Sequence, residues 1–147
     1  MKWIRKSFTD LTPNELYDIL HLRSAVFVVE QNCVYQDMDY NDQQALHLMG
    51  FDDTGKLAAY TRLFPAGVTF EMASIGRVLT GPSARGTGAG KELMQVSIDA
   101  VEAVWGKGPI KIGAQQYLKK FYESFGFEQV SDIYLEDGIE HIKMVRK

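Results

Sequence analysis

This chain of 147 residues has a single cysteine, a small net charge and no long apolar run. Cys33 is the only cysteine, so no disulfide can form within the chain, and a reducing, cytoplasmic setting is expected. The 16 basic and 19 acidic residues leave a formal net charge of −3, which offers no basic face to nucleic acid. No apolar run is long enough to cross a bilayer, and residues 1–6 lack the apolar stretch of a signal peptide. Neither nucleic-acid binding nor membrane insertion is therefore expected.

The composition is that of one globular domain covering residues 1–147. Hydrophobic residues make up 46% of the chain and charged residues 24%, which allows a sizeable core. Strand-like and helix-like patterns follow one another in the order β-α-β-β-β-α-β-α-β-β, which predicts an α/β fold with a mixed sheet. The predicted strands are 2–8, 45–51, 56–64, 69–80, 110–114, 127–135 and 140–145, and the predicted helices are 12–29, 88–105 and 116–125. Thr12 and Glu15 form a capping-box pattern around Pro13, which marks the start of the first helix.

The most informative stretch is a strand followed by a glycine-rich turn and a helix. Glycine stands at every second position of 86–90, where missing Cβ atoms let backbone amides converge on an anion at the positive end of the helix. Arg85 and Lys91 bracket this turn with positive charge. Gly76 within the preceding strand and the stop at Pro82 indicate a strand interrupted for a ligand. We therefore predict a cradle for phosphate or pyrophosphate, the alternative being an ordinary strand-to-helix turn.

Two other phosphate-binding loops do not fit this stretch. A Walker loop requires glycine where Arg85 stands, and serine or threonine where Glu92 follows Lys91. A dinucleotide fingerprint requires Gly-x-Gly-x-x-Gly after the first strand, whereas this turn is Gly-x-Gly-x-Gly and lies late in the chain. Nucleoside triphosphate and dinucleotide chemistry are both disfavoured.

Four stretches, which follow one another along the chain in the order that a known family has, carry a resemblance to that family. Residues 85–90 fit the pattern Gln/Arg-x-x-Gly-x-Gly/Ala, and 121–127 end a helix with Tyr-x-x-x-Gly-Phe. The chain thereby resembles the GNAT superfamily of acetyl-CoA-dependent N-acetyltransferases over essentially its whole length. Residues 23–37 and 136–142 are similar to the ElaA-like branch of that superfamily. One departure is Gln115, because many members carry asparagine at the start of the last helix.

The resemblance implies a fold, a co-substrate and a set of residues. The fold would be a GNAT-like mixed β-sheet with a splayed central strand, flanked by helices. The activity would be acetyl transfer from acetyl-CoA to a primary amine, small or peptidic, by direct attack and without a metal, and a homodimer would be common for the fold. The residues implied in cofactor binding are Val78, Leu79 and Thr80 for the pantetheine arm, Arg85, Gly86, Thr87, Gly88, Ala89, Gly90 and Lys91 for the pyrophosphate, and Gln115.

The same resemblance implies an acid and leaves the base open. Tyr122 would protonate the departing thiolate, because a phenol and a thiol have comparable pKa values. Its plain alternative is a half-buried aromatic residue in a helix. The candidate bases are Glu71, early on the predicted strand 69–80, His141 at the start of the last strand, Glu30 and His47. His47 is better explained as a strand residue whose hydrogen bonds are satisfied. A chain of water molecules can take the place of any single base.

The segment 30–44 has no apolar period and is predicted to be an ordered or lid-like loop. Its acidic residues Asp37, Asp39 and Asp42 would either guide a cationic amine or cap turns in a solvated loop. A second function class also stays open, namely a non-catalytic acyl-CoA-binding or regulatory module on the same fold. A retained tyrosine at 122 argues against it, because a pure binder has no need of an acid there.

Overall fold

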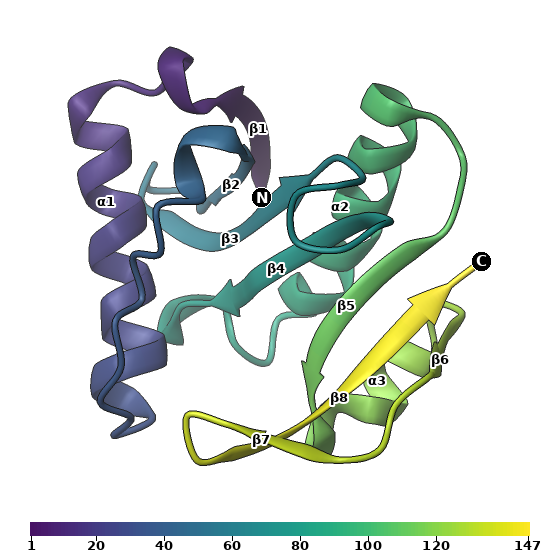
Figure 1. Cartoon of the computed structure of the whole chain (residues 1–147). Coiled ribbons are helices and arrows are strands. Elements are labelled where there is room, and N and C mark those ends of the chain that lie inside the picture. Colours follow the sequence, from purple (N-terminus) through teal and green to yellow (C-terminus); the bar gives the residue numbers. More distant parts are fainter.

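The computed structural model describes all residues 1–147 and shows one mixed sheet with helices on both faces (Figure 1). The strand order is β1-β2-β3-β4-β5-β8-β6, and β7 also pairs with β8. The strands are β1 (Lys2–Ser7), β2 (Leu46–Phe51), β3 (Leu57–Phe64), β4 (Ala73–Thr80), β5 (Ile110–Gln115), β6 (Phe127–Gln129), β7 (Tyr134–Glu136) and β8 (Ile139–Arg146). The helices are α1 (Pro13–Arg23), α2 (Ala89–Trp105) and α3 (Lys119–Glu123). The predicted α/β class and single mixed sheet are confirmed.

The first helix begins where its sequence signal placed it. The Thr12 hydroxyl accepts a hydrogen bond from the Glu15 amide at 3.1 Å, and the Glu15 carboxylate accepts one from the Thr12 amide at 2.8 Å. The helix was predicted to run to residue 29 as one α-helix. It instead changes after Arg23 into a π-helical segment, Ser24–Glu30, and such segments are frequent at functional sites.

The core lies on both faces of β3, whose residues are all buried. On one face Tyr60 packs with Ile19 of α1, and on the other Leu63 packs with Met94 and Ile98 of α2. Side chains alternate along a strand, so this single strand supports both layers of helices. Packing on both faces thereby fixes β3, next to which the neighbouring strands β4 and β5 diverge.

Among the helices, none has the length and apolar character that crossing a membrane requires.

The central strands β4 and β5 pair in parallel over only two positions, Ala73 with Ile110 and Ser74 with Lys111. Beyond Ser74 they diverge, while β4 stays paired with β3 up to Thr80 and β5 stays paired with β8 over its whole length. The edge of β4 that faces β5 therefore has no strand partner over the rest of its length. This fork confirms the predicted splayed central strand (Figure 1).

Three details of the predicted elements are corrected. The strand predicted from residue 69 begins at Ala73, so Glu71 lies in the preceding turn. The segment 127–135 is not one strand, because it breaks between β6 and β7, both of which pair with β8. The helix 116–125 contains a 3-10 turn, Gln116–Leu118, followed by the short α3.

Candidate active site

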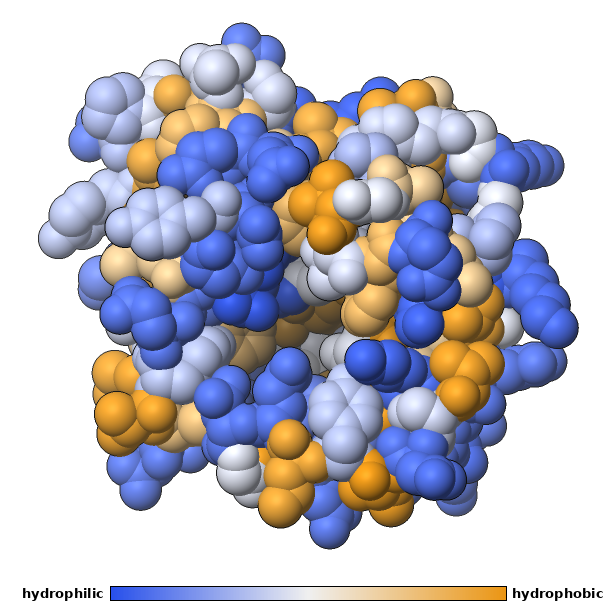
Figure 2. Space-filling model, in the orientation of Figure 1, coloured by the Kyte–Doolittle hydropathy of each residue, from blue (hydrophilic) through white to orange (hydrophobic).

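A cavity of about 920 Å³ opens at the fork between β4 and β5, and we refer to it as the fork cavity. Figure 2 shows a hollow near the middle of this face, with mostly hydrophilic residues at its mouth. Its volume is at the upper end of the range for small-molecule sites, roughly 300–1,000 Å³. The predicted site residues that line it are Glu30, Val78, Leu79, Thr80, Arg85, Gly90, Gln115, Tyr122 and His141.

The glycine-rich turn beside this cavity has the shape that the sequence predicted. Gly86 and Gly88 have φ angles of +75° and +83°, which residues with a side chain rarely adopt. The amides of Gly86, Thr87 and Gly88 donate to no acceptor within the protein, and these residues are exposed. Gly88 is the N-cap of α2 and has no capping side chain, so the first amides of the helix are also unpaired. Ala89 is buried, whereas Lys91 is exposed.

Arg85 lies between this turn and the end of β4. Its Nε and Nη2 atoms donate to the Thr80 carbonyl, each at 3.3 Å, and Nη2 pairs with the Glu30 carboxylate at 2.8 Å. Both side chains of the ion pair are more than 40% exposed, so the pair contributes little to stability and exchanges partners readily. Arg85 can therefore turn to a negative ligand at low cost.

Tyr122 is 5% exposed and lines the fork cavity, yet its hydroxyl has no hydrogen-bond partner in the protein. The ring is held by edge-to-face contacts with Phe121 and Phe127, at centroid distances of 5.2 and 6.0 Å. Burial, with a smaller contribution from Tyr117, raises the pKa of Tyr122, so the phenol keeps its proton across neutral pH. Since the raised pKa makes transfer of that proton to a thiolate uphill, the arrangement favours hydrogen-bond donation over the matched transfer expected from an unperturbed phenol.

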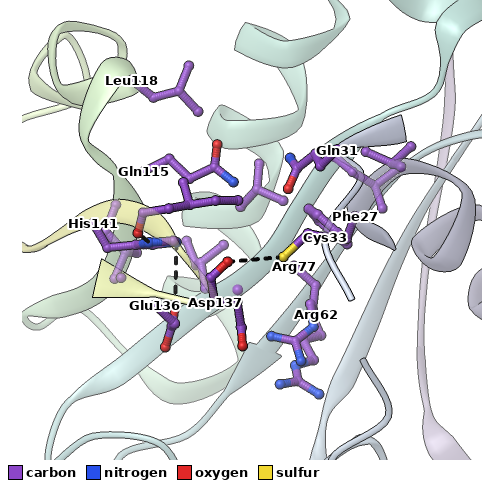
Figure 3. A pocket seen from close by; sticks show the side chains of 18 of the residues that line it. Phe27, Gln31, Cys33, Arg62, Arg77, Gln115, Leu118, Glu136, Asp137 and His141 are labelled. Atoms are coloured by element: carbon purple, nitrogen blue, oxygen red, sulfur yellow. Dashed lines mark hydrogen bonds and ion pairs between the residues drawn. The ribbon is translucent and has the colours of Figure 1, made fainter. Parts of the chain in front are cut away.

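His141 lies on β8 opposite Gln115 of β5, because these two strands pair antiparallel. Its Nδ1 atom lies 2.7 Å from the Ile139 carbonyl, which only accepts, so Nδ1 carries the hydrogen. Nε2 is then the basic nitrogen of the neutral ring, and it lies 3.5 Å from the Glu136 carboxylate. The ring also stacks on Tyr134 at 5.9 Å. In Figure 3 His141 and Glu136 lie across the pocket from Arg62 and Arg77.

Two of the other candidate bases lie outside the fork cavity. Glu71 does not line it; its exposed carboxylate pairs with Lys111 at 3.3 Å, at the closed end of the fork. His47 is fully buried and bonds the Tyr60 hydroxyl and the Asp42 carbonyl, which is the satisfied strand histidine that the sequence favoured. Burial lowers the pKa of His47, so it is neutral. Only Glu30 and His141 among the four candidates face the cavity.

Two of the three acidic residues of the loop are buried in ion pairs, whereas Asp39 is partly exposed and lines the fork cavity. Asp37 and Asp42 are only 6% exposed, and both bind the fully buried Arg23, at 2.9 and 2.7 Å. Arg62 completes the cluster by pairing with Asp39 and Asp42. Burial alone would raise the pKa of Asp39, but bonds from Arg62 and the Asn41 amide, with the charge of Arg77, outweigh it and lower that pKa. The aspartates therefore hold the loop in place through internal ion pairs.

Two residues that line the cavity, Arg77 and Cys33, were not predicted from the sequence as site residues. Arg77 lines the cavity, has φ +50° within β4, and donates to Asp37 from Nε at 2.8 Å. The strand irregularity that Gly76 predicted therefore lies at the next residue, Arg77. Cys33 also lines the cavity, and its thiol donates to the Asp137 carbonyl at 3.2 Å (Figure 3). No local pattern announces either contact, because the partners are distant in sequence.

The residues present fit an elongated ligand with a diphosphate and a pantetheine-like arm. A Cβ atom built at Gly86, Gly88 or Gly90 meets no other atom, so the space beside the unpaired amides is open. The free edge of β4 beyond Ser74 leads from this turn along the cavity. Backbone amides at a helix N-terminus suit a phosphate, and a free strand edge suits amide groups of an arm.

Comparison with known proteins gives a consistent result. The sequence profile of the family described as Acetyltransferase (GNAT) domain matches residues 9–147. Protein ElaA of Escherichia coli K12 is 40% identical over 149 residues, covering 100% of this chain and 97% of ElaA, and the crystal structure of E. coli ElaA superposes with a TM-score of 0.92.

Two further solved structures share the fold. An acyl-CoA N-acyltransferase from Pseudomonas aeruginosa is 42% identical, with all of both chains covered and a TM-score of 0.93. An aminoglycoside 6'-N-acetyltransferase complexed with coenzyme A has a TM-score of 0.69 over 97% of this chain and 96% of its own. At 15% identity, that likeness extends to the fold alone.

Proposed function

Because the chain belongs to the GNAT acetyltransferase family, as an ElaA-like acyl-CoA N-acyltransferase, we propose that it transfers an acetyl group from acetyl-CoA to a primary amine by direct attack. The observation that carries the proposal is Tyr122, whose ring is buried and whose hydroxyl, without a protein partner, lies open to the fork cavity. This hydroxyl is therefore free to donate a hydrogen bond to a ligand in the cavity.

The residues that would hold the coenzyme are those whose polar groups have no partner or a weakly held one. The amides of 86–88 and of the first turn of α2 would bind the pyrophosphate, with Arg85 and Lys91 supplying positive charge. The free edge of β4 at Val78, Leu79 and Thr80 would bind the pantetheine arm, and Arg85 would release the Thr80 carbonyl as it turns to the phosphates.

Two residues would move or hold protons in the transfer. The thioester supplies the acetyl group: a bond forms between the amine nitrogen and the carbonyl carbon, and the carbon–sulfur bond breaks. His141 Nε2 takes the proton that the amine loses, and Glu136 at 3.5 Å stabilises the resulting imidazolium. The Tyr122 hydroxyl donates a hydrogen bond to the departing thiolate and keeps its own proton. The thiolate takes a proton from water to leave as the thiol, and His141 returns the proton of the amine to water.

Turnover with a panel of acceptors tests the proposal. The protein is incubated with acetyl-CoA and with small amines, polyamines and peptides, free thiol is followed with a chromogenic reagent, and acetylated product is identified by mass spectrometry. We expect thiol release that depends on one class of amine. Calorimetric binding of acetyl-CoA without acetylation of any acceptor would favour the non-catalytic acyl-CoA-binding module instead.

A further inference from the structure

The backbone of β4 is strained at one residue, and this residue stands at the fork. Arg77 has φ +50°, a left-handed conformation that costs free energy for any residue with a Cβ atom. The register between β3 and β4 shifts at this point: Tyr60 pairs with Leu79 and Arg62 with Gly76, so Arg77 and Val78 together face Thr61. Such a bulge bends a strand, and β4 leaves β5 just before it.

The side chain of Arg77 offsets this strain through contacts with the segment 35–39. Nε donates to the Asp37 carboxylate at 2.8 Å, Nη2 donates to the Asp37 carbonyl at 2.9 Å, and Nη2 lies 3.5 Å from the Asp39 carboxylate. The guanidinium also lies over the Tyr35 ring at 6.0 Å, and the Tyr35 hydroxyl donates to Asp37 at 3.1 Å. Asp37 is in turn fixed from α1 by Arg23.

The segment that Arg77 holds forms part of the wall of the fork cavity. Tyr35, Gln36 and Asp39 line the cavity together with Arg77 itself. In Figure 3 Arg77 lies on the opposite side of the pocket from His141, the residue to which we assign proton uptake from the amine. One residue thus joins the strand that opens for the coenzyme to the loop that stands opposite the base.

We propose that Arg77 is a positioning residue for acyl transfer, and the proposal rests on the proposed function. Its left-handed backbone keeps β4 bulged and apart from β5, which leaves the strand edge free for coenzyme A. Its guanidinium anchors residues 35–39 as the acceptor-side wall of the cavity. The two tasks are separable, because glycine keeps the conformation without strain and without the side chain, whereas alanine keeps the strain and loses the anchor.

The test compares Arg77→Gly with Arg77→Ala. Calorimetry measures the Kd of coenzyme A, limited proteolysis measures the rate of cleavage within 35–41, and a thermal scan measures Tm. Both variants should be cleaved within 35–41 about tenfold faster or more, because charge-assisted hydrogen bonds that hold this segment are removed. Only Arg77→Ala should also bind coenzyme A about fivefold more weakly or worse, since its strain now favours a flattened strand.

A kinetic comparison separates positioning from a purely structural role. With the amine that the wild type acetylates fastest, Arg77→Gly should raise the KM for the amine about fivefold or more and leave the KM for acetyl-CoA unchanged. A purely structural arginine would lower Tm and leave both constants of the folded protein as they are. Arg146→Ala is the matched control, because Arg146 bonds the Phe125 carbonyl at 2.9 Å and Glu102 at 3.7 Å outside the cavity. It should lower Tm alone.

Two results would overturn the inference. Equal Kd values for coenzyme A in the glycine and alanine variants would remove the backbone role. An unchanged rate of cleavage within 35–41 in Arg77→Gly would remove the anchoring role. If the wild type itself fails to bind coenzyme A, the proposed function falls with the backbone role, while the proteolysis measurement still decides whether Arg77 anchors the loop.

Discussion

Replacing Tyr122 by phenylalanine removes one hydroxyl and almost nothing else. The Phe121 and Phe127 rings pack against the carbon skeleton of the ring, which phenylalanine retains. The hydroxyl has no partner in the protein, so its loss breaks no hydrogen bond in the free enzyme. Tm should therefore stay about the same, because the substitution removes no contact within the protein.

The effect on turnover follows from the charge that develops on sulfur. A hydrogen bond to a charged acceptor contributes about 1.5–3 kcal/mol. Since about 1.4 kcal/mol corresponds to tenfold in rate, Tyr122→Phe should lower kcat by about 10- to 150-fold. The Kd of coenzyme A should change little, because the bond strengthens only as the carbon–sulfur bond breaks.

The assay is steady-state thiol release with the best acceptor of the panel, alongside calorimetry and a thermal scan on the same preparations. Tyr17→Phe is the matched control, because this tyrosine of α1 is 72% exposed and does not line the cavity. Full turnover by Tyr122→Phe with every active acceptor would refute the reasoning. A large fall in Tm would show instead that the hydroxyl has a structural role.

Three further outcomes are expected. Gly90→Ala should unfold at the same or a higher temperature, because its φ is not positive and no atom lies within 4 Å of an added Cβ, but calorimetry should show weakened coenzyme A binding. His141→Gln should lower kcat by about 10²–10⁴-fold, whereas undiminished turnover would exclude His141 as the base. Asp42→Asn should lower the urea-derived free energy of unfolding by about 3–5 kcal/mol, because it leaves buried arginines short of a partner.

The stability of the fold should also fall at alkaline pH. Burial, with the charge of Asp37, raises the pKa of Tyr35 from its ordinary value of 10.0 to about 12. Between these two pKa values the native state keeps a proton that the unfolded chain releases. The free energy of unfolding is therefore not reduced by Tyr35 below pH 10, and it falls as the pH rises towards 12. Thermal scans across this range check the direction, and a Tm that rises with pH would contradict it.

Local patterns in the sequence predicted what depends on local geometry. The capping box at Thr12, the glycines at 86 and 88 with positive φ, and the order of strands and helices all follow from residues close together in the chain. The position of Tyr122 in the cavity followed from the family resemblance, because helical spacing alone indicated only a core aromatic.

The remaining features depend on contacts between distant residues. Asp37 meets Arg77 across 40 positions and Arg23 across 14, so the acidic loop is indistinguishable in sequence from a solvated one. The bulge fell on Arg77 although Gly76 is the residue that tolerates positive φ, because Asp37 and Asp39 hold the arginine side chain there. Glu71 was expected in the strand, but β4 begins only where pairing with β5 becomes available at Ala73.

The central claim is that coenzyme A binds the glycine-rich turn and the free edge of β4. Titration of ¹⁵N-labelled protein with coenzyme A, followed by NMR, observes those amides directly. The account predicts that the largest shifts fall on the amides of 86–91 and 78–80, and that they saturate together. Saturable binding with shifts confined to other parts of the chain, or no shifts at all, would contradict it.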